Sequence, residues 1–369
     1  MKNKSWSSRK DLRDVFKTSL KTVFTRSCLC VIMSSLLVSA CQKKDKPIDR
    51  NKVDIGVVIT TEQSYNSKIL WLDSQLEKVQ EQNLKYARLG TQFYSPESRN
   101  GKLFLIPQGL GKTKDAKKVI SIDKKSLAIE EYPFTNIAIN HMANIGNQVY
   151  AVNSGASDSC IESYNTKEHT NKIVQMDQTY LYSIIPADDR LLGFSTQAEL
   201  GTTKSKVTMN VFTSELQLLK EIDISNFGIP TRKYCEDDTD LYITVNYNNN
   251  DTSTGKILKI NKKDYHIKEI SLKQDFPNDI YKYGDHFIVK YFYRFQNIGT
   301  TVSVLDSAGR ERNIDLKTEL ALTAIKDEKF FVANNSGIQV YSIPDFKLLK
   351  EYSIDVKSSH YASALLVVE

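Results

Sequence analysis

The chain has 369 residues, of which 40% are hydrophobic and 25% are charged, and its formal net charge is +6. This balance excludes a disordered chain, and no apolar run beyond the N-terminal region is long enough to span a bilayer. The length allows one large repeat domain or two ordinary domains. The positive charge suggests a nucleic acid or an anionic membrane as partner, and the odd count of five cysteines needs an explanation.

The first 40 residues have the layout of an export signal. Eight lysine and arginine residues lie within residues 2–26, and an apolar stretch follows at residues 28–38. This stretch is too short for a spanning helix, as is typical of a secretory signal peptide. It ends in Leu-Val-Ser-Ala-Cys at residues 37–41, which resembles the lipobox of bacterial lipoproteins. The resemblance implies cleavage before Cys41 and a diacylglyceryl group on its thiol, which anchors the chain in a lipid bilayer.

An ordinary signal peptide with an incidental cysteine is the alternative interpretation. We expect a lipoprotein signal peptide over residues 1–40, the lipidated cysteine and a polar tether over residues 41–52, and one folded domain over residues 53–369. Removal of residues 1–40 takes away eight basic and two acidic residues, so 42 of each remain and the net charge becomes zero. The mature chain therefore gives no support for a nucleic-acid partner.

Short β-rich runs separated by polar turns make up the chain from residue 53 onward, with no convincing amphipathic helix. In each repeat an apolar strand ends in a turn residue whose side chain can accept backbone N–H groups. These turn residues are Asp73, Asp123, Asn165, Thr213, Asn261, Asp306 and Ser342, spaced 36 to 50 residues apart. Another strand lies upstream of each later turn, at residues 102–106, 148–153, 190–195, 240–246, 286–290 and 329–334.

The repeat length predicts the architecture, because four strands in about 40 to 50 residues are typical of a β-propeller blade. The first repeat starts at residues 53–60 and lacks its innermost strand, whereas the chain ends with an unpartnered strand at residues 364–369. Pairing these two strands closes the ring and removes exposed strand edges. We therefore predict an all-β fold: a seven-bladed β-propeller closed by pairing the C-terminal strand with the first blade.

Three of the second strands share an aromatic-to-asparagine pattern. They read Tyr-Ala-Val-Asn at residues 150–153, Tyr-Ile-Thr-Val-Asn at residues 242–246 and Phe-Val-Ala-Asn at residues 331–334. The pattern resembles the YVTN-type propellers of bacterial surface and exported proteins, within the quinoprotein-like propeller superfamily. The resemblance extends over residues 53–369 and implies a seven-bladed ring. WD and kelch propellers are poorer fits, since Trp71 is the one tryptophan after residue 40 and no diglycine pattern recurs.

The loops that join second and third strands are expected on one face of the ring, where propellers present ligand sites. Two of these loops carry unusual residues. Residues 246–251 contain several asparagines, among them Asn246, together with the aromatic residue Tyr247. Residues 290–297 contain a cluster of aromatic residues and an arginine. Such rings and a guanidinium group can stack on a sugar or a partner side chain. The predicted ligand-binding residues are Asn153, Asn246, Tyr247, Tyr293, Arg294, Phe295 and Asn334. The alternative is that the rings pack between blades and the asparagines form a flexible tip.

Catalytic, metal and cofactor patterns are not found in the sequence. The five histidines lack ligand spacing, and we expect His141 to be a hydrogen-bonded structural residue near an inner strand. Arg88 and Arg232 are expected near the ends of inner strands, but no acid–base pair accompanies them. We therefore assign no catalytic residue, no metal ligand and no cofactor. Cys160 and Cys235 are expected as free thiols, since the repeat register places them two blades apart.

Together these features predict a membrane-anchored extracytoplasmic lipoprotein on the outer face of the cell membrane, or on an outer membrane where the cell has one. Its expected role is that of a non-catalytic binding or scaffolding propeller for proteins or glycans of the cell envelope. The alternative is an envelope enzyme of lactonase-like or carbohydrate-active propeller type. A third hypothesis is an accessory subunit for membrane-protein assembly or export.

Overall fold

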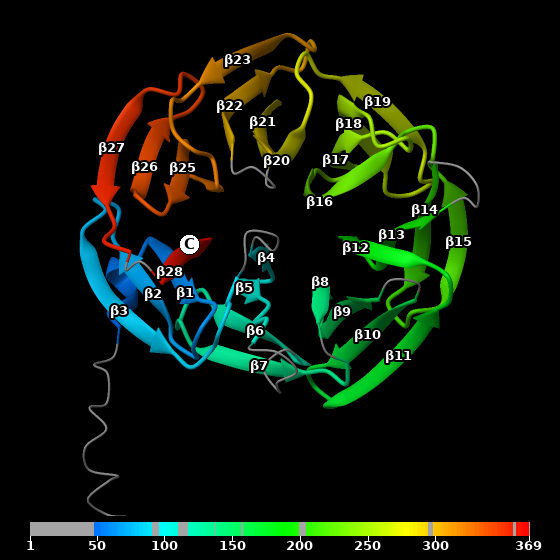
Figure 1. The fold of residues 1–369 in the computed structure, drawn as a ribbon, viewed down its shortest axis with the longest axis horizontal. Helices are drawn as coiled ribbons and strands as arrows, with labels where there is room; N and C mark the ends of the chain where they lie inside the picture. The colour runs from blue at the N-terminus through cyan, green and yellow to red at the C-terminus, as the bar shows by residue number, and fades with distance from the viewer. Residues whose placement is uncertain are drawn as a thin grey trace, which may run out of the picture. The chain divides into compact units, whose positions relative to one another are not determined.

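The computed structural model describes residues 48–90, 96–109, 117–136, 138–155, 158–198, 204–293, 298–356 and 359–368. In these ranges, 28 strands form seven four-stranded antiparallel sheets, and the one helical element is the short 3-10 helix η1 (Arg50–Lys52). Figure 1 shows the sheets as blades arranged in a ring. The predicted all-β, seven-bladed propeller is confirmed.

All blades have the same strand order from the channel outward. Blade 1 contains β28 (His360–Val367), β1 (Ile55–Thr61), β2 (Ser67–Leu72) and β3 (Lys78–Leu84). Blade 2 contains β4 (Glu97–Arg99), β5 (Lys102–Leu105), β6 (Lys118–Asp123) and β7 (Ile129–Pro133). Blade 3 contains β8 (Ile139–Ile145), β9 (Gln148–Ser154), β10 (Ser159–Asn165) and β11 (Thr170–Met176).

The remaining four blades repeat the pattern. Blade 4 contains β12 (Tyr180–Ala187), β13 (Arg190–Ala198), β14 (Ser205–Thr213) and β15 (Leu218–Asp223). Blade 5 contains β16 (Ile229–Glu236), β17 (Asp240–Tyr247), β18 (Ser253–Asn261) and β19 (Ile267–Ser271). Blade 6 contains β20 (Pro277–Tyr283), β21 (His286–Tyr293), β22 (Ile298–Leu305) and β23 (Glu311–Asp315). Blade 7 contains β24 (Leu322–Lys326), β25 (Lys329–Asn334), β26 (Gly337–Ser342) and β27 (Leu348–Ser353).

The seven predicted turn residues all lie in the hairpin between the third and the outer strand of a blade. Asp73 Oδ1 accepts the backbone N–H groups of Gln75 and Glu77, at 2.8 Å each. Every other turn residue also accepts a backbone N–H through its side chain. The prediction that these side chains shape the turns is therefore confirmed.

The same hairpins hold one residue in the left-handed backbone region, three or four positions after the turn residue. These residues are Leu76, Leu127, His169, Leu216, Tyr265, Gly309 and Phe346, with φ between 56° and 77°. A non-glycine residue there costs about 1–2 kcal/mol. Leu76, Leu127 and Leu216 are almost fully buried, and burial of a leucine contributes about 1.5–3 kcal/mol, which offsets that cost.

The ring closes between the two ends of the described chain. β28 pairs antiparallel with β1, from Val367 opposite Ile55 to His360 opposite Thr61. Beyond the ladder, the Val368 N–H donates to the Asp54 carbonyl oxygen at 2.9 Å. The predicted closure by the C-terminal strand is confirmed, and both edges of β1 are paired within blade 1.

Apolar side chains fill the space between neighbouring blades in seven clusters, one at each junction of the ring. Trp71 is fully buried between blades 1 and 2, and its Nε1 donates to Gln82 Oε1 at 3.0 Å. Gly56 lies opposite Trp71, where a Cβ atom would come within 2.4 Å of the ring. The tryptophan therefore fits only against a glycine.

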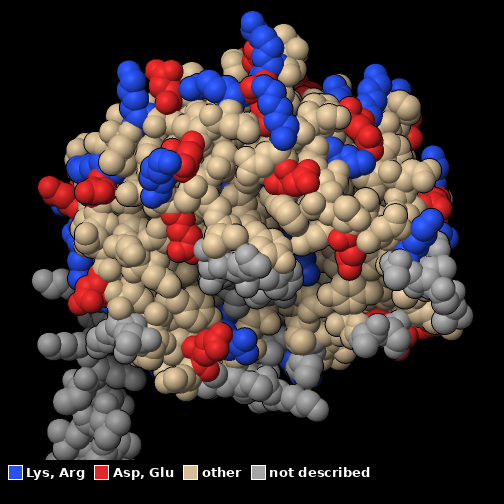
Figure 2. All heavy atoms as spheres, turned by 45° about the horizontal axis from the view of Figure 1, so that its top comes forward, with Lys and Arg blue, Asp and Glu red and all other residues tan. Residues whose placement is uncertain are grey.

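Cys160 on β10 and Cys235 on β16 are both free, in blades 3 and 5 as the repeat register predicts. No described segment forms a helix with the length and hydropathy needed to cross a membrane. Figure 2 shows basic and acidic side chains interspersed over the face it presents. The predicted signal peptide, Cys41 and the start of the tether lie outside the described residues, so these assignments stay predictions.

Candidate functional site

Two of the tyrosines predicted from the sequence come together through a third ring. Tyr247 ends β17 and Tyr293 ends β21, so they belong to neighbouring blades 5 and 6. Their ring centroids lie 5.5 Å and 5.3 Å from that of Phe276, which precedes β20. Burial, followed by the hydrogen bond with Tyr293, raises the pKa of Tyr247 to about 12. We call Tyr247, Phe276 and Tyr293 the aromatic cluster.

The other predicted ligand residues do not all join the aromatic cluster. Asn246 precedes Tyr247 on β17 and is partly exposed. Asn153 lies in blade 3, where its Nδ2 donates to the Ala138 carbonyl oxygen at 3.3 Å. Asn334 lies in blade 7, where its Oδ1 accepts two backbone N–H groups of its own loop. Both amides therefore bind nearby backbone. Arg294 and Phe295 lie outside the described residues.

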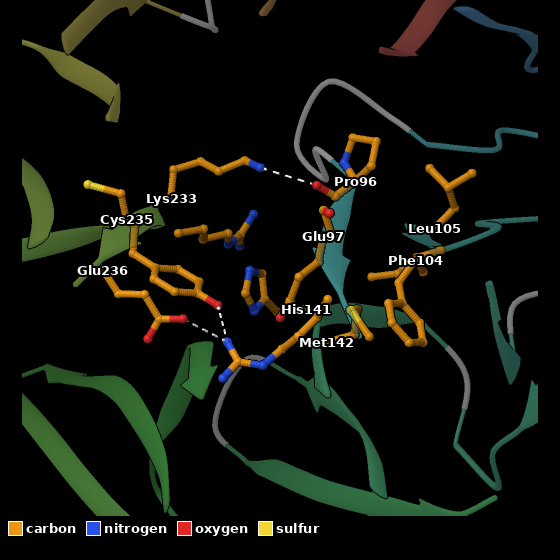
Figure 3. A pocket seen from close by; sticks show the side chains of 14 residues that line it. Pro96, Glu97, Phe104, Leu105, His141, Met142, Lys233, Cys235 and Glu236 are labelled. Carbon is orange, nitrogen blue, oxygen red and sulfur yellow. Dashed lines mark hydrogen bonds and ion pairs between the residues drawn. The ribbon is translucent and has the colours of Figure 1, made fainter. Parts of the chain in front are cut away.

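A second site, which sequence reasoning did not assemble, lies in the channel. It is a cavity of about 310 Å³ lined by the inner strands β4, β8 and β16 together with β5. Figure 3 shows Lys233, Cys235 and Glu236 on one side of it and Phe104 and Leu105 on the other. We call this cavity the channel pocket. It joins blades 2, 3 and 5.

Charged side chains cross the channel at this pocket. Arg99 Nη1 of β4 lies 3.1 Å from Glu236 Oε1 of β16 and donates to the Tyr234 hydroxyl at 3.4 Å. Glu236 Oε2 also lies 2.9 Å from Lys262 Nζ. Two cations therefore hold the Glu236 carboxylate, and blade 2 is tied to blade 5.

Glu97 is the second acid of the channel pocket. Its Oε1 atom is buried and has no hydrogen-bond partner among the described residues. Burial raises the pKa of Glu97 to about 7, although the positive charges of Arg99 and Lys233 act in the opposite direction. This carboxyl group therefore gains and loses a proton near neutral pH.

Basic side chains of β16 and an imidazole of β8 complete the pocket. Arg232 Nε donates to the Tyr182 carbonyl oxygen at 3.0 Å, and Lys233 Nζ lies 3.5 Å from the Pro96 carbonyl oxygen. His141 Nδ1 accepts the Ile184 N–H at 3.3 Å. Burial, then the charges of Arg232 and Lys233, lower the pKa of His141 to about 3, so the imidazole is neutral. His141 is hydrogen-bonded near an inner strand, as predicted.

Sequence reasoning found part of this site and missed the rest. Arg232 was expected at an inner strand and lies on β16. Arg88 was expected at one too, but it follows β3 outside any strand, with Nη2 3.8 Å from Glu62 Oε1. Glu97 and Arg99 were not singled out, because β4 has only three residues and lacks an apolar pattern. Glu97 and Arg99 could have been recognised as part of an inner strand, because they lie just before the predicted strand at residues 102–106.

In the described part of the chain, no group of three or more histidine, cysteine, aspartate or glutamate side chains comes together. The channel pocket combines arginine and lysine side chains with two glutamates, a set that can form charge-assisted hydrogen bonds with an organic ligand.

Comparison with known proteins assigns no family to the chain. No protein-family model matches the sequence, and no curated protein matches it. Among solved structures, AztD of Citrobacter koseri is similar at 11% identity and a TM-score of 0.46, over 85% of this chain and 98% of AztD. The dihydro-heme d1 dehydrogenase NirN, in complex with DHE, is similar at 10% identity and a TM-score of 0.48, over 85% of this chain and 75% of NirN. Apo AztD gives a TM-score of 0.44 at 12% identity, over 85% of this chain and 98% of that chain.

Proposed function

We propose that this protein is a membrane-anchored extracytoplasmic lipoprotein whose propeller is a non-catalytic binding module for a glycan of the cell envelope. The aromatic cluster carries the proposal, because two rings at the ends of second strands in neighbouring blades are joined there by the ring of Phe276. The C–H faces of sugars are apolar and stack on such rings, while hydroxyl groups bind amides such as that of Asn246. A protein partner of the envelope is the other occupant that tyrosine rings favour.

Replacement of Tyr293 by alanine tests the aromatic cluster. We expect Tyr293→Ala to weaken glycan binding by at least about 10-fold, since a ring contact contributes about 0.5–1.5 kcal/mol beyond its buried area. Binding of the full chain to a glycan array measures the effect. Tyr65→Ala is the matched control, because Tyr65 is exposed and lies in the loop between β1 and β2.

Unchanged glycan binding by Tyr293→Ala would contradict the proposal that the aromatic cluster is the glycan-binding surface. Crosslinking on intact cells that captures a protein through Tyr293, with no glycan bound on the array, would assign the surface to a protein partner instead.

Replacement of Cys41 tests the anchor separately. Because two acyl chains on Cys41 are needed for stable membrane attachment, we expect Cys41→Ala to move the protein from the membrane pellet into the soluble fraction. Cell fractionation with immunoblotting measures this. Retention of the variant in the membrane would contradict lipidation at Cys41.

The alternative, an envelope enzyme, is favoured by one observation. Glu97, whose pKa is about 7, lies in a cavity with Arg99 and Lys233, and such a carboxyl group is suited to general acid–base catalysis. Turnover of a lactone or a glycoside by the protein, abolished in Glu97→Gln, would support the enzyme in place of the binding module.

A further inference from the structure

The channel pocket has the size of a small-molecule site. Its volume of about 310 Å³ lies at the lower end of the range of ligand pockets and is too small for a polymer. It is distinct from the aromatic cluster, with which it shares no lining residue. A ligand here would therefore be different from an envelope glycan.

The walls of the pocket differ in polarity. Phe104, Ile106 and Met142, from β5, its C-terminal end and β8, line it with almost completely buried apolar side chains. Lys233 and Glu236 of β16 lie on the opposite side from Phe104 in Figure 3. A ligand that fills the pocket therefore needs an apolar part for one wall and a polar group for the other.

The charges of the lining residues define the polar group. Arg99, Arg232 and Lys233 are positive, and Glu236 is the acid already bound by Arg99 and Lys262. While Glu97 carries its proton, the lining residues hold three positive charges and one negative charge. An anion is therefore attracted and a cation is repelled.

We propose that the channel pocket binds a small organic carboxylate. The carboxylate lies between the basic side chains of β16 and the carboxyl group of Glu97, and the apolar part of the ligand packs against Phe104 and Met142. Protonated Glu97 donates its O–H to the ligand, which gives a partner to a carboxyl group whose buried Oε1 has none among the described residues. Inorganic phosphate lacks the apolar part and fits less well.

Binding of the carboxylate is linked to the proton on Glu97. The groups that act on Glu97 are Arg99 on its own strand and Lys233, Tyr234 and Glu236 on β16; Arg232 and the neutral His141 also line the pocket. Ionisation of Glu97 places a second negative charge beside the ligand and removes the donated hydrogen. Affinity therefore falls as the pH rises through about 7, by about 10-fold between pH 6 and pH 8.

Calorimetry with benzoate as the probe tests the site on the full chain in a non-ionic detergent. We expect benzoate to bind at pH 6 and about 10-fold more weakly at pH 8, while its neutral analogue benzamide and inorganic phosphate bind at least 10-fold more weakly than benzoate at pH 6. Benzoate binding that is absent up to 10 mM, or equal to benzamide binding, would overturn the proposal.

Two variants assign the residues. Glu97→Gln keeps a donor but cannot ionise, so we expect benzoate binding at pH 6 to remain and its pH dependence to disappear. Lys233→Met keeps a side chain of similar length and removes its positive charge, so we expect at least a 10-fold loss of affinity for benzoate. Lys256→Met is the control, since Lys256 is in the same blade, pairs with Glu269 and does not line the pocket.

Thermal unfolding of each variant shows whether it folds. Full pH dependence in a folded Glu97→Gln variant would overturn the role of this carboxyl group, and unchanged affinity in Lys233→Met would overturn the anion site. Tyr293→Ala is expected to bind benzoate normally, so this proposal and the glycan-binding proposal fail separately.

Discussion

An ion pair in blade 6 is almost completely buried. Asp279 on β20 and Lys290 on β21 are register partners, their Oδ2 and Nζ atoms are 2.5 Å apart, and their side chains are 2% and 1% exposed. Lys290 Nζ also lies 5.5 Å from the centre of the Phe292 ring. Removing two charges from water costs several kcal/mol, so each charge depends on the other.

Lys290→Met is expected to destabilise the protein by about 3–5 kcal/mol, because it leaves the Asp279 charge buried without its cation. Urea unfolding measures the free energy. The double variant Asp279→Val, Lys290→Met is expected to recover most of the loss, since neither charge is then buried. A single Lys290→Met variant as stable as the natural protein would contradict the importance of the pair. Lys256→Met, at a more exposed pair, is expected to cost less than about 1 kcal/mol.

At the scale of elements, the hairpins show what a sequence pattern can and cannot predict. Their turn residues could be predicted because the side chains of Asp, Asn, Ser and Thr accept backbone N–H groups of the same turn, which is a purely local interaction. The left-handed residue that follows was not found. At four of the seven positions the residue is Leu76, Leu127, Leu216 or Phe346, and packing of the buried side chain against a neighbouring blade offsets the cost of the left-handed backbone. That burial is a property of the assembled ring.

The inner strands explain why the candidate site was predicted only in part. The second and third strands of the blades were found by their apolar patterns, whereas β4 is Glu-Ser-Arg and β16 carries Arg232, Lys233 and Glu236. Strands that line a polar channel lose the pattern by which strands are recognised. The aromatic cluster was also predicted only in part. Tyr247 and Tyr293 were identified from the sequence, but Phe276, which contacts both rings, was not. Phe276 precedes the inner strand β20, which the apolar pattern did not reveal.

At the scale of the whole molecule, stability depends on the closure between β28 and β1. A chain that ends at residue 359 would lose this ladder and expose the paired edge of β1, which is buried throughout its length. We expect the truncated protein to aggregate and to lose cooperative thermal unfolding. Light scattering and calorimetry measure both.

A peptide of residues 359–369 added in trans is expected to restore cooperative unfolding, since it supplies the missing strand. A peptide of the same composition in scrambled order is the control. A truncated protein that stays monomeric and melts like the full chain would contradict closure by β28.

The pair between Arg99 and Glu236 has a consequence for how the protein folds. These residues are 137 positions apart, and they meet only across the channel, after the blades between them have formed and curved into an arc. Contacts of such large sequence separation form late, because the intervening chain must first be ordered. The channel pocket therefore comes into being only after blades 2 to 5 have formed and packed side by side. A fragment that lacks blade 2 or blade 5 would keep its local hairpins and lack this binding site.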